Sequence, residues 1–186
     1  MGDHAITLLK EHNSGSAGKA PTFDELYNDH HVKVLKAAFR VTGNLQDAED
    51  VLQTVFLRLL KRQDRPELGA NSAGYLCKAA INAGLDLLRA RNRTQTETLN
   101  DEIHHSQNDA ADSDVRQAEH RKHLRSALLS LDQHAAEVFA LRYFEDFGNA
   151  DIANLLDTSP NSIAVTLHRT RERLQKILGE LEGESR

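Results

Sequence analysis

The sequence predicts an all-α fold of two small helical domains joined by a flexible acidic linker. Three observations support this prediction: apolar residues recur at helical spacing through most of the chain, aromatic residues are scarce, and one acidic segment has no period. Hydrophobic residues make up 39% of the 186 positions, aromatic residues make up 5%, and tryptophan is absent. A core of Leu, Ala, Val and Ile favours helices packed on helices over a sheet sandwich.

The first predicted helix covers about residues 22–42. Thr22 followed by Glu25 is a capping box, in which a hydroxyl and a carboxylate bond the free amides at a helix start. Apolar residues then recur at helical spacing up to Gly43, which suits the left-handed end of a helix. Residues 1–21 are rich in Gly, Ser, Ala and Lys without any period, so we expect a disordered leader there.

Two further helices complete the first predicted domain. Asn44 can cap a second helix that ends near Arg62 and carries one broad apolar stripe. After a loop, Asn71 or Ser72 caps a third helix, which runs to about Arg93.

The acidic charge of the chain is concentrated in one segment. Residues 94–120 hold seven acidic side chains against one arginine, a balance of −6 within a total net charge of −5, so the remainder is near +1. Residues 94–114 are also polar and aperiodic, and bury too little apolar surface to offset chain entropy. We therefore expect a linker at 94–114, between a first domain at 22–93 and a second at 115–186.

The second domain contains a pattern typical of a helix-turn-helix. Helical period extends from about residue 115 to 144 and breaks at Gly148, and two further helices are predicted at about 149–156 and 160–180. Asp157 lies in the turn between them and tolerates a left-handed backbone. Ser159 followed by Pro160 is a helix cap with proline at the first helical position. The last helix is rich in arginine, which indicates duplex DNA binding.

One face of the third predicted helix combines an aromatic ring, an amide and three cations. At about 100° per residue these side chains align: Tyr75, Lys78, Asn82, Arg89 and Arg93. Rings stack on bases, amides pair with base edges and cations hold phosphates, so the stripe suits an unpaired strand. By itself, the stripe fits an ordinary solvated helical face at least as well.

Three segments, in this order, resemble the extracytoplasmic-function (ECF) sigma factors of the bacterial sigma-70 class. They read "DAEDVLQTVFLRLLKR" at 47–62, "YLCKAAINAGLDLLRARNR" at 75–93 and "VFALRYFEDFGNADIANLLDTSPNSIAVTLHRTRERL" at 138–174. The resemblance implies a protein that binds core RNA polymerase, melts a promoter and directs transcription initiation.

The resemblance also implies which residues act. The outward face of the second helix would press against the coiled-coil clamp helices of the largest polymerase subunit. We call this set the polymerase face: Asp47, Asp50, Gln53, Thr54, Leu57, Arg58 and Lys61. The five aligned residues of the third helix become the minus-ten face, in which Asn82 would capture a base flipped from the non-template strand.

In the second domain the resemblance implies recognition of the minus-35 element. The minus-35 face consists of Asn161, Ser162, Thr166, His168, Arg169, Arg171 and Arg173. The family often has Lys or Arg at the positions of Ala164 and Thr166, so this chain lacks two expected cations. Each phosphate contact contributes about 0.9 to the salt dependence of binding, and the departure therefore predicts weaker sequence-independent affinity.

The sequence predicts no enzyme, cofactor or metal site. It shows no nucleophile–base pair, no paired catalytic carboxylates and no phosphate-cradling glycine loop. The ten histidines have no cysteine cluster beside them, and the single cysteine, Cys77, lies between apolar residues and is predicted to be a core residue. Because no secretory signal or long apolar segment occurs, we expect a cytoplasmic protein without membrane insertion.

The expected partners are core RNA polymerase, promoter DNA (duplex at minus-35, single-stranded at minus-ten) and an anti-sigma protein that holds the chain inactive. Two alternatives remain. The first is a helix-turn-helix regulator that binds duplex DNA as a dimer without polymerase. The second is a sigma-like decoy that binds an anti-sigma factor and no promoter, which Ala164 and Thr166 keep open.

Overall fold

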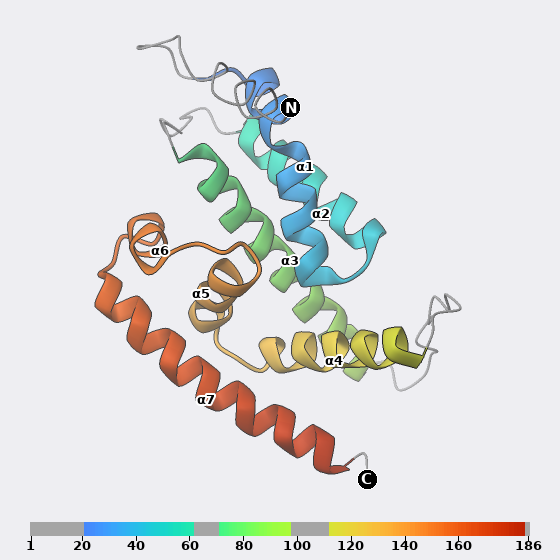
Figure 1. The fold of residues 1–186 in the computed structure, drawn as a ribbon. Coiled ribbons are helices and arrows are strands. Elements are labelled where there is room, and N and C mark those ends of the chain that lie inside the picture. Colours follow the sequence, from blue (N-terminus) through green and yellow to red (C-terminus); the bar gives the residue numbers. More distant parts are fainter. Residues whose placement is uncertain (1–20, 62–70, 98–111, 185–186) are drawn as a thin grey trace, which may run out of the picture.

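The computed structural model describes residues 21–61, 71–97 and 112–184. These residues form seven α-helices and no strand (Figure 1), which confirms the predicted all-α fold. The helices are α1 (Phe23–Thr42), α2 (Leu45–Lys61), α3 (Ser72–Glu97), α4 (Asp112–Leu129), α5 (Gln133–Tyr143), α6 (Asn149–Leu155) and α7 (Pro160–Glu184).

Helices α1, α2 and α3 pack on one another as the first bundle. The predicted capping box is present, with Glu25 N donating to the Thr22 hydroxyl over 3.3 Å and Thr22 N donating to the Glu25 carboxylate over 2.7 Å. Gly43 ends α1 with φ 69°, a left-handed conformation. Asn44 starts α2, because its side-chain oxygen accepts from Asp47 N over 3.1 Å. Local sequence signals thus set both ends of the α1–α2 turn.

The carboxylate of Asp47 is buried between α2 and α3. Asp47 is 5% exposed, and its two oxygens accept from the Arg91 guanidinium over 2.8 and 2.9 Å. The prediction that Asp47 belongs to the outward polymerase face is therefore wrong. The side chain lies on the buried side of α2 because Asp47 stands four residues before Val51 and eight before Val55, which are both buried.

Helices α4 to α7 form the second bundle. The stretch predicted to be helical from about residue 115 to 144 is divided in two, since Asp132 caps α5 by accepting from Ala135 N over 2.8 Å. The helix-turn-helix prediction is confirmed by α6 and α7, which contact each other. Asp157 has φ 51° in the turn, and the Ser159 hydroxyl accepts from Ser162 N over 3.1 Å.

The predicted linker at 94–114 is helical at both ends. Helix α3 continues to Glu97 and α4 begins at Asp112, so the prediction of a flexible chain is wrong for 94–97 and 112–114. The extension of α3 to Glu97 adds a hydrogen bond per residue without a new nucleation step. Polar residues can therefore continue a helix that has already formed. The rest of the predicted linker, residues 98–111, and leader residues 1–20 lie outside the described residues.

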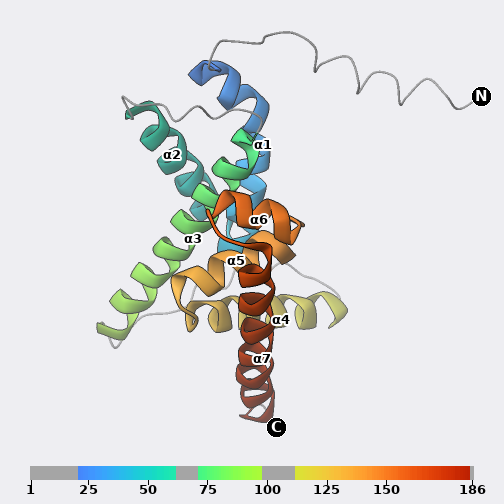
Figure 2. The same ribbon diagram turned by 90° about the vertical axis from the view of Figure 1, so that its left-hand side faces the viewer.

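The two bundles are packed against each other through α5. This helix contacts both α3 and α7 and lies between them (Figures 1 and 2). Ile81 and Leu85 of α3 are buried in one apolar cluster with Val138 and Leu141 of α5. Full burial of such a side chain stabilises a fold by about 1.5–3 kcal/mol. The two predicted domains are therefore packed against each other, an arrangement that the sequence left open.

A buried carboxylate adds to the contact between the bundles. The side chain of Glu145, which follows α5, is 2% exposed and accepts from the Arg40 guanidinium of α1 over 2.8 Å. Glu145 also lies beside Cys77 of α3. Burial first, and then the negative charge of Glu145, raise the pKa of the Cys77 thiol to about 11. The predicted burial of Cys77 is confirmed.

We expect Arg91→Ala to lower the free energy of unfolding by about 1–3 kcal/mol, because the buried Asp47 carboxylate loses both hydrogen bonds. Urea denaturation measures this loss. Arg93→Ala is the matched control, because Arg93 is exposed and stands two residues further along α3. Equal losses in both variants would contradict a structural role for the Asp47–Arg91 pair.

The Cys77 thiol of the folded chain should resist chemical modification. The thiolate is the reactive form, and a rise from the ordinary 9.0 to about 11 lowers its fraction at pH 8. We expect reaction with an aromatic disulfide reagent at pH 8 to be at least about 100-fold slower than in urea. Equal rates in the folded and unfolded chain would contradict this burial.

Candidate polymerase and nucleic-acid interface

Most of the predicted polymerase face on α2 is exposed, although Asp47 is buried. Five members of the polymerase face are exposed and Thr54 is half-buried. The exposed five are Asp50, Gln53, Leu57, Arg58 and Lys61. Leu57 is 52% exposed, and Leu60, which the sequence analysis missed, is 53% exposed. These two leucines are neighbours on the helix surface because they stand three residues apart. The face therefore has an apolar centre with charged side chains around it.

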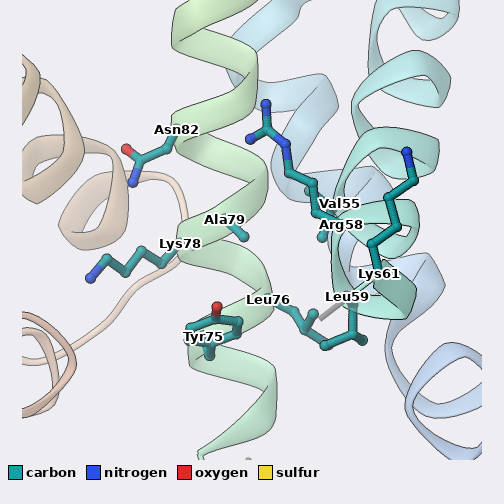
Figure 3. A pocket seen from close by; sticks show the side chains of 9 residues that line it. All are labelled: Val55, Arg58, Leu59, Lys61, Tyr75, Leu76, Lys78, Ala79 and Asn82. Carbon is teal, nitrogen blue, oxygen red and sulfur yellow. The ribbon is translucent and has the colours of Figure 1, made fainter. Parts of the chain in front are cut away.

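A cleft of about 650 Å³ lies between the end of α2 and the first half of α3 (Figure 3). Arg58 and Lys61 of the polymerase face line it, and so do Tyr75, Lys78 and Asn82 of the minus-ten face. The remaining lining residues are Val55, Leu59, Leu76 and Ala79. The structure thus brings two predicted sites to one cleft, in which cations, a ring and an amide border an apolar floor.

Three members of the minus-ten face bond the second bundle. Asn82 Nδ2 donates to the Glu137 carboxylate over 2.6 Å, and Gln133 Nε2 donates to Asn82 Oδ1 over 2.9 Å. Figure 3 shows Lys78 and Asn82 pointing away from α2, toward the other bundle. Helix α5 covers this side of α3, and the role of these residues in binding a strand stays a prediction.

The other two contacts of this kind involve backbone carbonyls. Lys78 Nζ donates to the Leu155 carbonyl of α6 over 3.3 Å. An Arg89 amino group donates to the Leu131 carbonyl, just before α5, over 3.0 Å. Of the two remaining members of the minus-ten face, Tyr75 is half-buried and Arg93 is exposed.

The covered stripe of α3 also contains apolar residues that the sequence analysis missed. Ile81 and Leu85 lie between the polar members of the minus-ten face and are fully buried against α5. Their spacing from Lys78 and Arg89 is that of one helical face. Two large aliphatic side chains within a predicted polar stripe were the signal that another element packs there.

The outer side of α7 carries the predicted minus-35 face. Six of its seven members are exposed and Thr166 is half-buried; the exposed six are Asn161, Ser162, His168, Arg169, Arg171 and Arg173. The opposite side of α7 is held in the core by Ile163, Leu167, Thr170 and Leu174. Val165 is also exposed among these residues and was missed. An apolar side chain of this kind can contact the methyl group of a thymine.

Electrostatic contacts on α7 are few among the described residues. The His168 ring and the Glu172 carboxylate lie 3.4 Å apart, with both side chains exposed. An Arg173 amino group donates to the Ser130 carbonyl over 3.1 Å. Thr166, Arg169 and Arg173 border a shallow cleft of about 310 Å³ against the α4–α5 turn. Arg169 and Arg171 thus keep their guanidinium groups accessible to phosphates.

The described residues hold no group of three or more His, Cys, Asp or Glu side chains that could bind a metal ion. No helix in the described ranges is long and apolar enough to cross a membrane.

Comparison with known proteins places these surfaces in a family. The family Sigma-70 region 2 matches residues 26–94, and the family Sigma-70, region 4 matches residues 121–174. The first match covers most of α1 to α3, and the second runs from α4 into α7. The polymerase and minus-ten faces therefore fall in the first matched region, and the minus-35 face falls in the second.

The chain is also similar to curated relatives along most of its length. The chain is 27% identical over 176 residues to the ECF RNA polymerase sigma factor SigE of Mycolicibacterium smegmatis, covering 92% of this chain and 67% of that protein. It is 29% identical over 167 residues to the RNA polymerase sigma factor CarQ of Myxococcus xanthus, covering 90% and 95%.

The fold is similar to that of the sigma factor RpoE in its complex with the anti-sigma factor NepR from Bartonella quintana. The TM-score is 0.52 at 22% sequence identity, over 84% of this chain and 96% of RpoE. The order of the matched regions, the exposed α2 face and the helix-turn-helix agree with one assignment: the chain belongs to the sigma-70 family, as an ECF RNA polymerase sigma factor.

Proposed function

We propose that this sigma factor binds core RNA polymerase through α2, holds the unpaired minus-ten strand in the α2–α3 cleft, and reads the minus-35 duplex with α7. The observation that carries the proposal is the cleft of about 650 Å³, because polymerase-face and minus-ten residues meet there. A duplex regulator that acts without polymerase has no use for such a cleft or for the exposed α2 face.

The exposed surface of α2 has the composition of a protein–protein interface. Leu57 and Leu60 form an apolar centre, and Asp50, Arg58 and Lys61 surround it. Interfaces of this kind combine an apolar core with a polar rim. The polymerase clamp helices are the partner that the family assignment favours for this surface.

The side chains of the cleft suit a flipped base and its backbone. Arg58 and Lys61 supply charge for phosphates, Tyr75 supplies a ring for stacking, and Asn82 supplies an amide for a base edge. Removing a base from the stack costs a few kcal/mol. Hydrogen bonds from Asn82 and stacking on Tyr75 would offset that cost, with Lys78 beside the strand.

Recognition of the minus-35 element falls to the exposed side of α7. Asn161 and Ser162 stand at the start of the helix, where side chains enter the major groove in helix-turn-helix proteins. Arg169 and Arg171 provide phosphate contacts. Because Ala164 replaces a cation that is common in the family, the salt dependence of this contact should be shallow.

An anti-sigma protein is the proposed regulator, and the cytoplasm is the proposed place of action beside RNA polymerase. The RpoE structure to which the fold is similar is a complex with the anti-sigma factor NepR. We extend this mode of control to the present chain. A catalytic role is not part of the proposal, because sigma factors act as initiation factors.

The direct test mixes the purified chain with core RNA polymerase and a library of promoter fragments. Co-elution with polymerase together with run-off transcripts supports the proposal. Co-elution with polymerase, or binding of an anti-sigma factor, without transcripts favours the sigma-like decoy. DNA binding without co-elution favours a duplex regulator.

Asn82→Ala should lower open-complex formation by about 10- to 100-fold while leaving polymerase binding unchanged. The variant loses the amide that pairs with the flipped base, a contact worth about 1–3 kcal/mol. Permanganate reactivity of unpaired thymines measures melting, and co-elution measures polymerase binding. Asn92→Ala, on the exposed end of α3, is the control. Normal melting by Asn82→Ala would contradict the assigned role.

Asp50→Arg should weaken polymerase binding at least about tenfold, because a reversed charge at a complementary interface costs more than about 1.4 kcal/mol. Fluorescence titration with core polymerase measures the affinity. Asp29→Arg changes the charge equally at an exposed position on α1 and should bind normally. The assignment of the α2 face would be wrong if both variants bound polymerase like the unmodified chain.

A further inference from the structure

Arginine and aromatic side chains meet in a further cleft, at the junction of the two bundles. The cleft has a volume of about 690 Å³ and lies where the end of α1, the second half of α4 and the end of α5 come together (Figures 1 and 2). Its lining includes three arginines and three aromatic residues: Arg40, Arg121, Arg125, Phe39, Tyr143 and Phe144. We call it the arginine cleft. It shares no residue with the polymerase, minus-ten or minus-35 faces, so the proposed function does not use it.

The positive charge of the arginine cleft is only partly neutralised. Arg40 pairs with Glu145 over 2.8 Å, but in the described part of the chain no carboxylate pairs with Arg121 or Arg125. These two arginines stand four residues apart on α4, so their side chains lie on the same side of the helix. Like charges at this spacing repel each other. An anion bound between Arg121 and Arg125 would offset that repulsion.

The Arg125 guanidinium is also partly withdrawn from water. It packs on the backbone of Gly43, where a β-carbon would lie 2.6 Å from Nη1 of Arg125. Burial first, and then the charge of Arg121, lower the pKa of Arg125. Both causes disfavour the charged guanidinium, and a bound anion would favour it. The absence of a side chain at Gly43 thus leaves room for a cation whose charge is poorly compensated.

The aromatic side chains offer a stacking surface beside these cations. Phe39 and Tyr143 are each 47% exposed. The Tyr143 ring is supported by Phe139, with the two ring centres 4.5 Å apart. Exposed rings next to cations suit a ligand that combines a planar group with phosphates, because rings stack on bases and cations hold phosphates. A ligand of phosphate alone would leave both rings unused.

We propose that the arginine cleft binds a nucleoside di- or triphosphate. The phosphates lie between Arg121 and Arg125, with a further donor from Arg40, and the base stacks on Phe39 or Tyr143. The volume of about 690 Å³ falls within the range of about 300–1,000 Å³ that is typical of small-molecule sites. Because the lining residues come from α1, α4 and α5, the bound nucleotide joins the two bundles. Stacking tolerates any base, so the site discriminates little between purines and pyrimidines.

Equilibrium dialysis of the full-length chain with labelled ATP, at low salt, tests the phosphate contacts. We expect one ATP per chain. Arg121→Glu should weaken binding at least about tenfold, because it replaces attraction for phosphate with repulsion. Lys122→Glu is the matched control, since it makes the same charge change at the next exposed position of α4, outside the cleft. The control should bind ATP within about twofold of the unmodified chain.

Phe39→Ala tests the stacking contact. This variant should bind ATP about tenfold more weakly and bind inorganic tripolyphosphate as the unmodified chain does. Phe39 and Arg121 are both exposed, and circular dichroism melts establish that each variant is folded. In the same melts, ATP should raise the unfolding midpoint of the unmodified chain and leave that of Arg121→Glu unchanged, because a ligand stabilises only the form that binds it.

The inference would be overturned if the unmodified chain bound no ATP at about 1 mM. Equal weakening by Arg121→Glu and Lys122→Glu would also overturn it, because binding would then be a general response to charge. The same holds if ATP and tripolyphosphate bind equally well and Phe39→Ala changes neither, because the cleft would then recognise phosphate alone. A polyglutamate peptide that binds where ATP does not would assign the cleft to an acidic protein segment instead. None of these results bears on the proposed function, which is tested with core polymerase.

Discussion

The contact between α3 and α5 is the constraint on which the arrangement of the molecule depends. Ile81 and Leu85 bury apolar surface against α5, and Asn82 bonds Glu137 between them. Apolar packing supplies the affinity of such a contact, and the buried amide–carboxylate hydrogen bond fixes its register. Because α3 also carries the proposed minus-ten face, one helix side serves two mutually exclusive partners. The structure of the free chain and its DNA-bound function are therefore coupled.

The two sides of α2 explain how a small first bundle can be stable and still present an exposed surface to a partner. Apolar packing and the Asp47–Arg91 pair hold the inner side of α2 against the rest of the first bundle. The stability of the bundle therefore does not depend on the outer side. An exposed pair of leucines on a surface of this kind costs little in the free chain. It becomes favourable when a partner covers it. The surface for the proposed polymerase contact is thus present before any partner binds.

Local signals in the sequence were sufficient to predict the start of α1, the turn between α1 and α2, and the helix-turn-helix. The Thr22 cap, the left-handed Gly43 and the Ser159 cap act within one turn of chain, so neighbouring residues determine them. Partners distant in sequence could not be predicted in this way. Aspartate is usually a surface residue, and Asp47 is buried because Arg91 of α3 pairs with it. The cover over Asn82 comes from a helix more than fifty residues away, although Ile81 and Leu85 within the polar stripe indicated that something packs there.

The most direct measurement is single-molecule energy transfer between dyes on Asp29→Cys of α1 and Glu180→Cys of α7, in a Cys77→Ser background. Both labelled positions are exposed, so the dyes leave the contact between the bundles intact. The account predicts one dominant high-transfer population in the free chain, and a shift to low transfer when core polymerase and melted promoter DNA are both present. A free chain that already shows the low-transfer distribution, unchanged by polymerase and DNA, would contradict it.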